Sequence, residues 1–139
     1  MPTRTAADDI AAICALKSSY CWYFDDSNLE DLLTLFTDDA VCELGTFGSW
    51  SGRDEIASGY RAQMVDSQVP GGRMHALSNP LIDVDGDRAT GRWSLVDYDI
   101  SGGSEQPIRL LASYRDEYRY LDGRWLMART ALTIHWRAW

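Results

Sequence analysis

The chain has 139 residues, of which 45% are hydrophobic and 24% charged, a composition typical of one globular domain with a sizeable buried core. Its formal net charge of −8 argues against a nucleic-acid-binding surface and against binding to an anionic membrane. The three cysteines lack Cys-x-x-Cys spacing, and no apolar run approaches the roughly 20 residues that cross a bilayer. We therefore expect a cytoplasmic protein with neither a disulfide framework nor a zinc site.

The first half of the chain predicts three helices. Apolar residues recur at helical spacing from about Ala7 onward, and Asp8 and Asp9 suit the positive N-terminal end of such a helix. Ser27 to Glu30 has the spacing of a capping box and would open a second short helix. A third helix is predicted over Arg53–Met64. The apolar positions of the three stripes are Ile10, Ile13, Leu16, Tyr20 and Phe24; Leu29, Leu32, Leu33 and Phe36; and Ile56, Tyr60 and Met64.

The second half predicts strands. A first strand, Ala40–Leu44, precedes the third helix and is separated from it by the glycine-rich link 45–52. Two hairpins follow, one turning at Asp85-Gly86-Asp87 and one at Asp122-Gly123. Their strands are expected at Met74–Val84, Arg88–Ile100, Ile108–Tyr120 and Arg124–Trp136, with loops at 68–72 and 101–107. The pattern predicts an α+β fold over a single domain, residues 1–139, with three N-terminal helices packed on one face of a curved sheet.

Two polar residues in apolar surroundings are the candidate catalytic pair. Asp25 follows the aromatic run Tyr20–Phe24, and His75 lies in a predicted strand. An imidazole titrates near neutral pH and a carboxylate can orient it, so the two can form an acid–base dyad. Helix phase favours Asp25 over Asp26, although either carboxylate fits. A lone histidine on an apolar strand is also often a plain core residue.

The ordered segments of the chain resemble the SnoaL-like group of the nuclear transport factor 2 superfamily. The resemblance is carried by 25–28 leading to 36–41, by Gly52-Arg53-Asp54 and by the late segment 118–125. It implies a cone-shaped α+β barrel that encloses a cavity, and a homodimer or homotrimer formed through the sheet. The superfamily contains enzymes and binding modules alike, so the site residues must decide the function.

The resemblance also implies roles for individual residues. Asp25 and His75 fall where scytalone dehydratase, the bile-acid dehydratase and the hexachlorocyclohexane dehydrochlorinase place an Asp–His dyad. Tyr20 and Asp97 resemble a tyrosine and a second aspartate of the bile-acid dehydratase site. Arg129 resembles the dehydrochlorinase arginine that assists the leaving group. These elimination enzymes use no metal and no organic cofactor. Further pocket residues are expected at Trp22, Phe24, Tyr60, Trp93, Tyr114 and Met127.

Together the residues and the resemblance predict a cofactor-independent lyase that removes water from a small cyclic, steroid-like or polyketide-like hydroxy compound. His75 would be the base, Tyr20 a hydrogen-bond donor and Arg129 a cation for developing negative charge. Strand alternation leaves Asp97 and Arg129 open to a structural role, for example as a buried pair. An isomerase or polyketide cyclase in the same pocket, or a non-catalytic small-molecule-binding module, are the alternatives.

Overall fold

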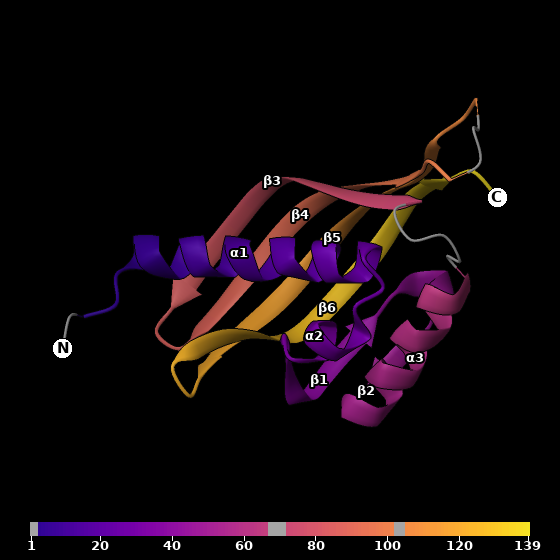
Figure 1. Cartoon of the computed structure of the whole chain (residues 1–139). Helices are drawn as coiled ribbons and strands as arrows, with labels where there is room; N and C mark the ends of the chain where they lie inside the picture. Colours follow the sequence, from indigo (N-terminus) through magenta and orange to yellow (C-terminus); the bar gives the residue numbers. More distant parts are fainter. Residues whose placement is uncertain (1–2, 67–71, 102–104) are drawn as a thin grey trace.

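Three helices pack on a six-stranded mixed sheet that is not closed into a barrel, in a computed structural model that describes residues 3–66, 72–101 and 105–139 (Figure 1). This confirms the predicted α+β class. The elements, in chain order, are α1 (Ala6–Asp25), α2 (Leu29–Leu33), β1 (Phe36–Glu43), the 3-10 turn η1 (Gly45–Phe47), β2 (Ser49–Ser51), α3 (Arg53–Asp66), β3 (Arg73–Asp85), β4 (Arg88–Asp99), β5 (Ile108–Leu121) and β6 (Arg124–Arg137).

The strand order is β2-β1-β6-β5-β4-β3, so β2 and β3 are the two edges of the sheet. All neighbours are antiparallel except β1 and β6, which run parallel. Figure 1 shows α1 lying across the sheet next to β3, with α2 and α3 beside β1 and β2. The helices therefore cover one face of the sheet, and the residues between the two layers form the core.

Helix α1 begins with a capping box, and its predicted apolar stripe is buried at every position except Ile10. Thr5 accepts a hydrogen bond from the backbone N–H of Asp8, whose carboxylate accepts one from the backbone N–H of Thr5. At the start of the helix Asp9 is buried and Ile10 is 38% exposed, so Asp9 takes the core position that the pattern gives to Ile10. The reason is that the Asp9 carboxylate accepts the indole N–H of Trp125 at 2.9 Å and pairs with Arg4 at 2.6 Å.

Helix α2 starts one residue later than its predicted capping box. Asn28, not Ser27, is the N-cap, and its side chain accepts the backbone N–H of Asp31. Ser27 instead adopts a positive φ of 55°, which turns the chain between the two helices. Phe36 does not belong to α2, because it is the first residue of β1. Strand β1 thus begins four residues before the predicted Ala40.

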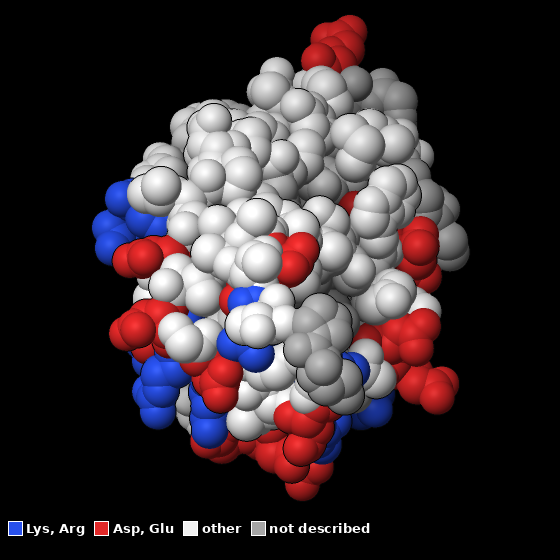
Figure 2. Space-filling model, turned by 90° about the vertical axis from the view of Figure 1, so that its left-hand side faces the viewer, with Lys and Arg blue, Asp and Glu red and all other residues white. Residues whose placement is uncertain are grey.

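Both predicted hairpins are present, with glycines Gly86 and Gly123 at positive φ in their turns. The link 45–52 contains η1 and the short strand β2. The expected loop at 68–72 lies outside the described ranges except for its last residue. Of the expected loop at 101–107, residues 102–104 lie outside them, and the other four residues belong to no helix or strand. Figure 2 views the molecule from the left of Figure 1, and in its lower part acidic and basic side chains lie close together, whereas the upper part is largely uncharged.

A β-bulge in β6 reverses the side-chain alternation of that strand. Glu117 of β5 pairs with Arg129, whereas the next residue, Tyr118, pairs with Met127, so Ala128 is the extra residue. Met127 is fully buried, and beyond the bulge the buried position is Thr130. Arg129 therefore faces away from Met127, contrary to the strict alternation that puts them on one face.

A polar network lies inside the core. Lys17 is 0% exposed, and its ammonium pairs with the carboxylate of Asp116 at 3.0 Å. Asp116 also accepts the hydroxyl of Tyr118 at 2.6 Å and that of Thr130 at 2.7 Å. The ammonium lies 3.6 Å from the ring centroid of Tyr114. The network ties α1 to β5 and β6.

Candidate active site

The last residue of α1 and the start of β3 hold the candidate dyad. Nδ1 of His75 lies 2.6 Å from Oδ1 of Asp25, and the backbone N–H of His75 donates to Oδ2 at 2.9 Å. Both side chains are about nine-tenths buried. The His75 ring also packs edge-on against Phe24, with the ring centroids 5.0 Å apart. The carboxylate is thus fixed at both oxygens and can fix the imidazole in turn.

This arrangement determines which ring nitrogen of His75 can act as a base. An ionised Asp25 only accepts hydrogen bonds, so the short contact requires a proton on Nδ1. In the neutral ring Nε2 then carries the lone pair. Nε2 lies 4.0 Å from Oδ2 of Asp97, which is too far for a hydrogen bond. The two atoms are still close enough for both to reach the same hydrogen atom of a substrate.

Asp97 belongs to a second ion pair that the sequence does not reveal. The guanidinium of Arg73 donates from Nη2 to Oδ2 at 2.8 Å, and from Nε to Oδ1 at 3.4 Å. Asp97 is 2% exposed and Arg73 11% at their side chains. Arg73 stands two residues before His75 on β3, so strand alternation could have placed both on one face. Asp97 pairs with Arg73 rather than with Arg129.

Three tyrosines form the far wall of the site. The hydroxyl of Tyr20 lies 2.9 Å from that of Tyr60, with either atom able to donate. The rings of Tyr20 and Tyr114 meet edge-on at 6.1 Å. Burial raises the pKa of Tyr20 far above its usual range and acts in the same direction on Tyr60 and Tyr114. These hydroxyls therefore stay protonated and can serve as donors but not as bases.

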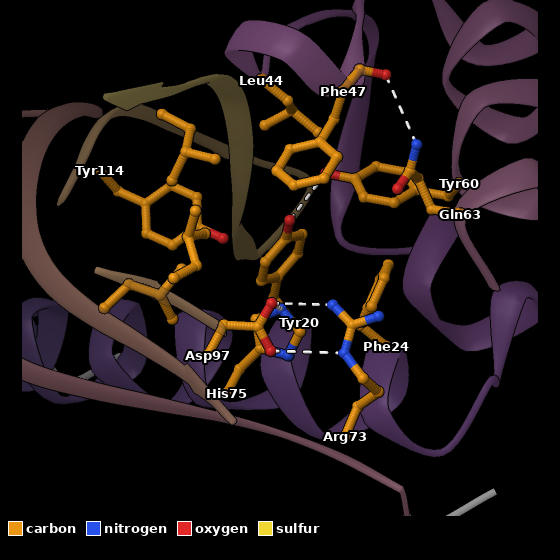
Figure 3. A pocket seen from close by; sticks show the side chains of 13 residues that line it. Tyr20, Phe24, Leu44, Phe47, Tyr60, Gln63, Arg73, His75, Asp97 and Tyr114 are labelled. Carbon is orange, nitrogen blue, oxygen red and sulfur yellow. Dashed lines mark hydrogen bonds and ion pairs between the residues drawn. The ribbon is translucent and has the colours of Figure 1, made fainter. Parts of the chain in front are cut away.

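The ion pair of Arg73 and Asp97, the ring of His75 and the three tyrosines border one cavity of about 40 Å³ (Figure 3). A volume of this size holds water, whereas pockets for drug-sized ligands span roughly 300–1,000 Å³. Phe47 and Gln63 are its partly exposed lining residues from η1 and α3, and they are joined by a hydrogen bond of 3.5 Å. The lining consists of Tyr20, Phe24, Leu44, Phe47, Tyr60, Gln63, Arg73, His75, Leu95, Asp97, Leu110, Tyr114 and Leu132.

A second hollow of about 310 Å³ lies on the other side of the dyad. Asp25 borders this hollow, while His75 and Arg73 border both spaces. Trp22 lines the outer hollow and is 67% exposed, so it is not a residue of the inner cavity as predicted. Asp26 is exposed beside it. Since Nε2 of His75 is directed toward Asp97, the chemistry belongs to the inner cavity.

Three more predicted site residues lie away from the cavity lining. Arg129 faces the outside of the sheet, where it pairs with Glu43 at 2.7 Å, because the bulge at Ala128 turns it outward. Trp93 shares an inner strand face with Asp97 but lies farther along β4, and its indole N–H donates to the hydroxyl of Tyr118. Met127 is fully buried in the core.

Within the described ranges, no group of three or more His, Cys, Asp or Glu side chains could hold a metal ion. Among the same residues, no helix is both long and apolar enough to cross a bilayer.

Solved structures share this fold over nearly the whole chain. Rv3472 of Mycobacterium tuberculosis, a protein of unknown function, is 25% identical, with a TM-score of 0.82 over 99% of this chain and 80% of that one. A Novosphingobium aromaticivorans protein that bears the provisional name scytalone dehydratase is 24% identical, with a TM-score of 0.79 over 91% and 84%. A Streptomyces avermitilis protein with the provisional name dehydratase, from the NTF2-like family, is 16% identical, with a TM-score of 0.81 over 95% and 99%.

None of the curated proteins compared with this chain matches it. The family assignment therefore rests on the sequence pattern of the domain itself, together with the shared fold. The SnoaL-like domain pattern matches residues 5–131, which include both members of the candidate dyad and every lining residue of the cavity except Leu132. The chain belongs to the SnoaL-like domain family of the NTF2-like superfamily.

Proposed function

We propose that this protein is a cofactor-independent lyase that removes water from a small cyclic hydroxy compound of steroid-like or polyketide-like type. The observation that carries the proposal is the 2.6 Å contact between Asp25 and Nδ1 of His75, which leaves Nε2 as a base on the cavity side. The provisional dehydratase names of two proteins that share the fold are consistent with it.

In the proposed reaction, Nε2 of His75 removes a proton next to a carbonyl group of the substrate. Asp25 holds the ring in the required tautomer and stabilises the imidazolium that forms. The protonated His75 then returns this proton to the departing hydroxyl, which leaves as water. Tyr20, kept protonated by its burial, is placed to donate a hydrogen bond to a substrate oxygen.

A ring compound needs more room than the cavity offers at about 40 Å³. Phe47 and Gln63 are two of the five partly exposed lining residues, and the Gln63 side-chain amide donates only a long hydrogen bond, 3.5 Å, to the backbone carbonyl of Phe47. Displacement of these two side chains is therefore the proposed route by which the substrate enters.

The homodimer or homotrimer formed through the sheet and the cytoplasmic location stay predictions. Light scattering on the purified protein tests the oligomeric state.

The decisive experiment is water loss from a panel of cyclic β-hydroxy ketones, followed by mass spectrometry. His75→Ala should lower turnover by about 10²–10⁴-fold, because a general base is removed. His135→Ala is the matched control, since the second histidine is exposed and bonds only to Ser113 among the described residues. Equal turnover of His75→Ala and the wild type would show that His75 is not the base.

The adjacent carboxylates offer a second matched pair. Asp25→Asn should lower turnover steeply, because an amide can donate to Nδ1 and stabilise the wrong tautomer. Asp26→Asn should have little effect, since Asp26 is exposed and its backbone caps α1. A larger effect of Asp26→Asn would assign the dyad carboxylate to Asp26.

An isomerase is the second candidate function, and Asp97 is the observation that favours it. Its carboxylate lies in the cavity 4.0 Å from Nε2, so two proton carriers lie within reach of one substrate. Isomerisation leaves the mass of the product unchanged, whereas elimination removes one water. Products of unchanged mass with an Asp97-dependent rate would replace the lyase with the isomerase.

A further inference from the structure

The cavity contains one permanently charged cation among its described lining residues, Arg73. Arg129, to which the family resemblance gave this role, lies on the other face of the sheet. Arg73 is 11% exposed at its side chain, and such burial of a guanidinium is costly unless it is paired. Its pairing with Asp97 explains how the charge is tolerated but not why it borders the cavity.

The guanidinium has donors left after Asp97 is satisfied. Of its five N–H groups, Asp97 takes one from Nε and one from Nη2. Figure 3 shows Asp97 along one edge of the guanidinium, while the third nitrogen points away from it. The carboxylate therefore orients Arg73 and leaves N–H groups for a further oxygen acceptor.

Arg73 also stands at the right place relative to the proposed base. Arg73 and His75 are two residues apart on β3, and both reach Asp97, the first at 2.8 Å and the second, through Nε2, at 4.0 Å. A carbonyl oxygen bound to Arg73 thus brings the neighbouring C–H group toward Nε2. A proton taken at Nε2 leaves its electrons to move onto the oxygen at Arg73.

The charges of the groups around the proposed base indicate which kind of substrate fits. With neutral His75, the groups Arg73, Asp25 and Asp97 sum to one net negative charge, which opposes a substrate carboxylate. A neutral carbonyl compound adds no charge, and its proton transfer creates an imidazolium and an enolate together. Arg109 is near enough to interact with Arg73 and Asp97, but it is not one of the residues that line the cavity.

We propose that Arg73 binds the carbonyl oxygen of a neutral, enolisable substrate and stabilises the enolate that forms when Nε2 of His75 takes the adjacent proton. The carbonyl re-forms as the C–O bond to the β-hydroxyl breaks, and the hydroxyl leaves as water with the proton from His75. The step needs no oxidant or further reactant. This inference rests on the proposed lyase function.

The test uses 4-nitrophenol, a neutral phenol whose ionised form resembles an enolate and absorbs visible light. The wild-type protein should bind it saturably and increase the nitrophenolate band at a pH where the free probe is largely protonated. Arg73→Gln should weaken binding of the ionised probe about 10- to 100-fold, the loss expected for one charge-assisted hydrogen bond. Arg129→Gln, which removes an outward-facing arginine, is the matched control and should bind like the wild type.

Loss of Arg73 leaves Asp97 buried and unpaired, so Arg73→Gln alone can unfold. The double variant Arg73→Gln/Asp97→Asn removes both charges and keeps two amides that can bond to each other. It should fold, by circular dichroism, and should fail to ionise the probe. Arg73→Lys should recover part of the band.

Three results would overturn the inference: wild-type protein that does not ionise the probe, a double variant that ionises it as the wild type does, or benzoate binding more tightly than 4-nitrophenol. None of these results bears on His75, because the water-loss assay with His75→Ala tests the lyase itself. In the water-loss assay the double variant should lose more in kcat than in KM, because Arg73 binds the charged enolate more strongly than the neutral carbonyl.

Discussion

The buried pair of Lys17 and Asp116 makes a sharp prediction about stability. Lys17→Met keeps the length and apolar stem of the side chain but leaves the carboxylate of Asp116 buried without its cation. Breaking such a pair costs about 3–5 kcal/mol. The cation–π contact with Tyr114, at 3.6 Å, adds roughly 1–2 kcal/mol in a desolvated place. The hydroxyls of Tyr118 and Thr130 still bind Asp116 and limit the damage.

We therefore expect Lys17→Met to lower the free energy of unfolding by about 3–5 kcal/mol. For 139 residues the unfolding entropy is ~0.3 kcal/mol per kelvin, so Tm should fall by about 10–17 °C. Urea unfolding and calorimetry measure the two quantities. Arg53→Met is the matched control, because its partner Asp38 is almost fully exposed, and a surface pair is worth about 1 kcal/mol or less.

The double variant Lys17→Met/Asp116→Asn completes the cycle. An amide at position 116 carries no charge, and its oxygen can accept one of the hydroxyls of Tyr118 and Thr130 while its NH2 group donates to the other, so it should regain at least ~2 kcal/mol relative to Lys17→Met. A Lys17→Met protein that loses less than about 1 kcal/mol would refute the reasoning, since a carboxylate cannot remain ionised and unpaired in an apolar core so cheaply.

Three further predictions concern single groups. Burial raises the pKa of Cys21 and Cys42 from 9.0 to about 12, so the stability they contribute is complete below pH 9 and is lost as pH rises toward 12. By pH 10, urea unfolding should show a loss of roughly 1.4 kcal/mol in the free energy of unfolding per thiol. A Cys21→Ala/Cys42→Ala protein should lose less over the same pH range. Gly59→Ala places a methyl group into the indole of Trp50 and should cost about 1–3 kcal/mol of stability, whereas the same change in a Trp50→Ala background should be stabilising by roughly 1 kcal/mol; a stabilising effect in both backgrounds would exclude the clash. Trp22→Ser should change the free energy of unfolding by less than about 0.5 kcal/mol, and a larger loss on urea unfolding would mean that Trp22 is buried in solution.

The fold could be predicted because its signals are local. Alternating apolar residues and the two Asp–Gly turns determine the hairpins, and the order of helices and strands then leaves few arrangements. The boundaries were harder, because side-chain hydrogen bonds decide them. Asn28 caps α2 in place of Ser27, and Asp9 faces the core in place of Ile10, since each satisfies a donor that a hydrophobic pattern does not register.

The site was predictable only in part. Helix phase and the scarcity of histidine singled out Asp25 and His75, and the resemblance to enzymes with an Asp–His dyad indicated that the two pair. Arg129 was misplaced because one inserted residue, Ala128, shifts the strand by one position, and the sequence has no glycine or other mark there. Arg73 was missed because the predicted strand began one residue later, at Met74, so Arg73 was not assigned to a face of the sheet. Its spacing of two residues from His75 is the signal that could have found it.

The hydrogen bond from the backbone of His75 to Asp25 has a consequence for association between molecules. Strand β3 is an edge of the sheet, and an edge with free N–H groups invites pairing with a strand of another chain. Asp25 occupies one of these donors, and farther along the strand Pro80 has none to offer, next to the irregular pairing at Ser78 to Leu81. The carboxylate of Asp25, which orients His75, thus also blocks a backbone donor at the sheet edge. Replacing Asp25 therefore favours aggregation as well as loss of activity.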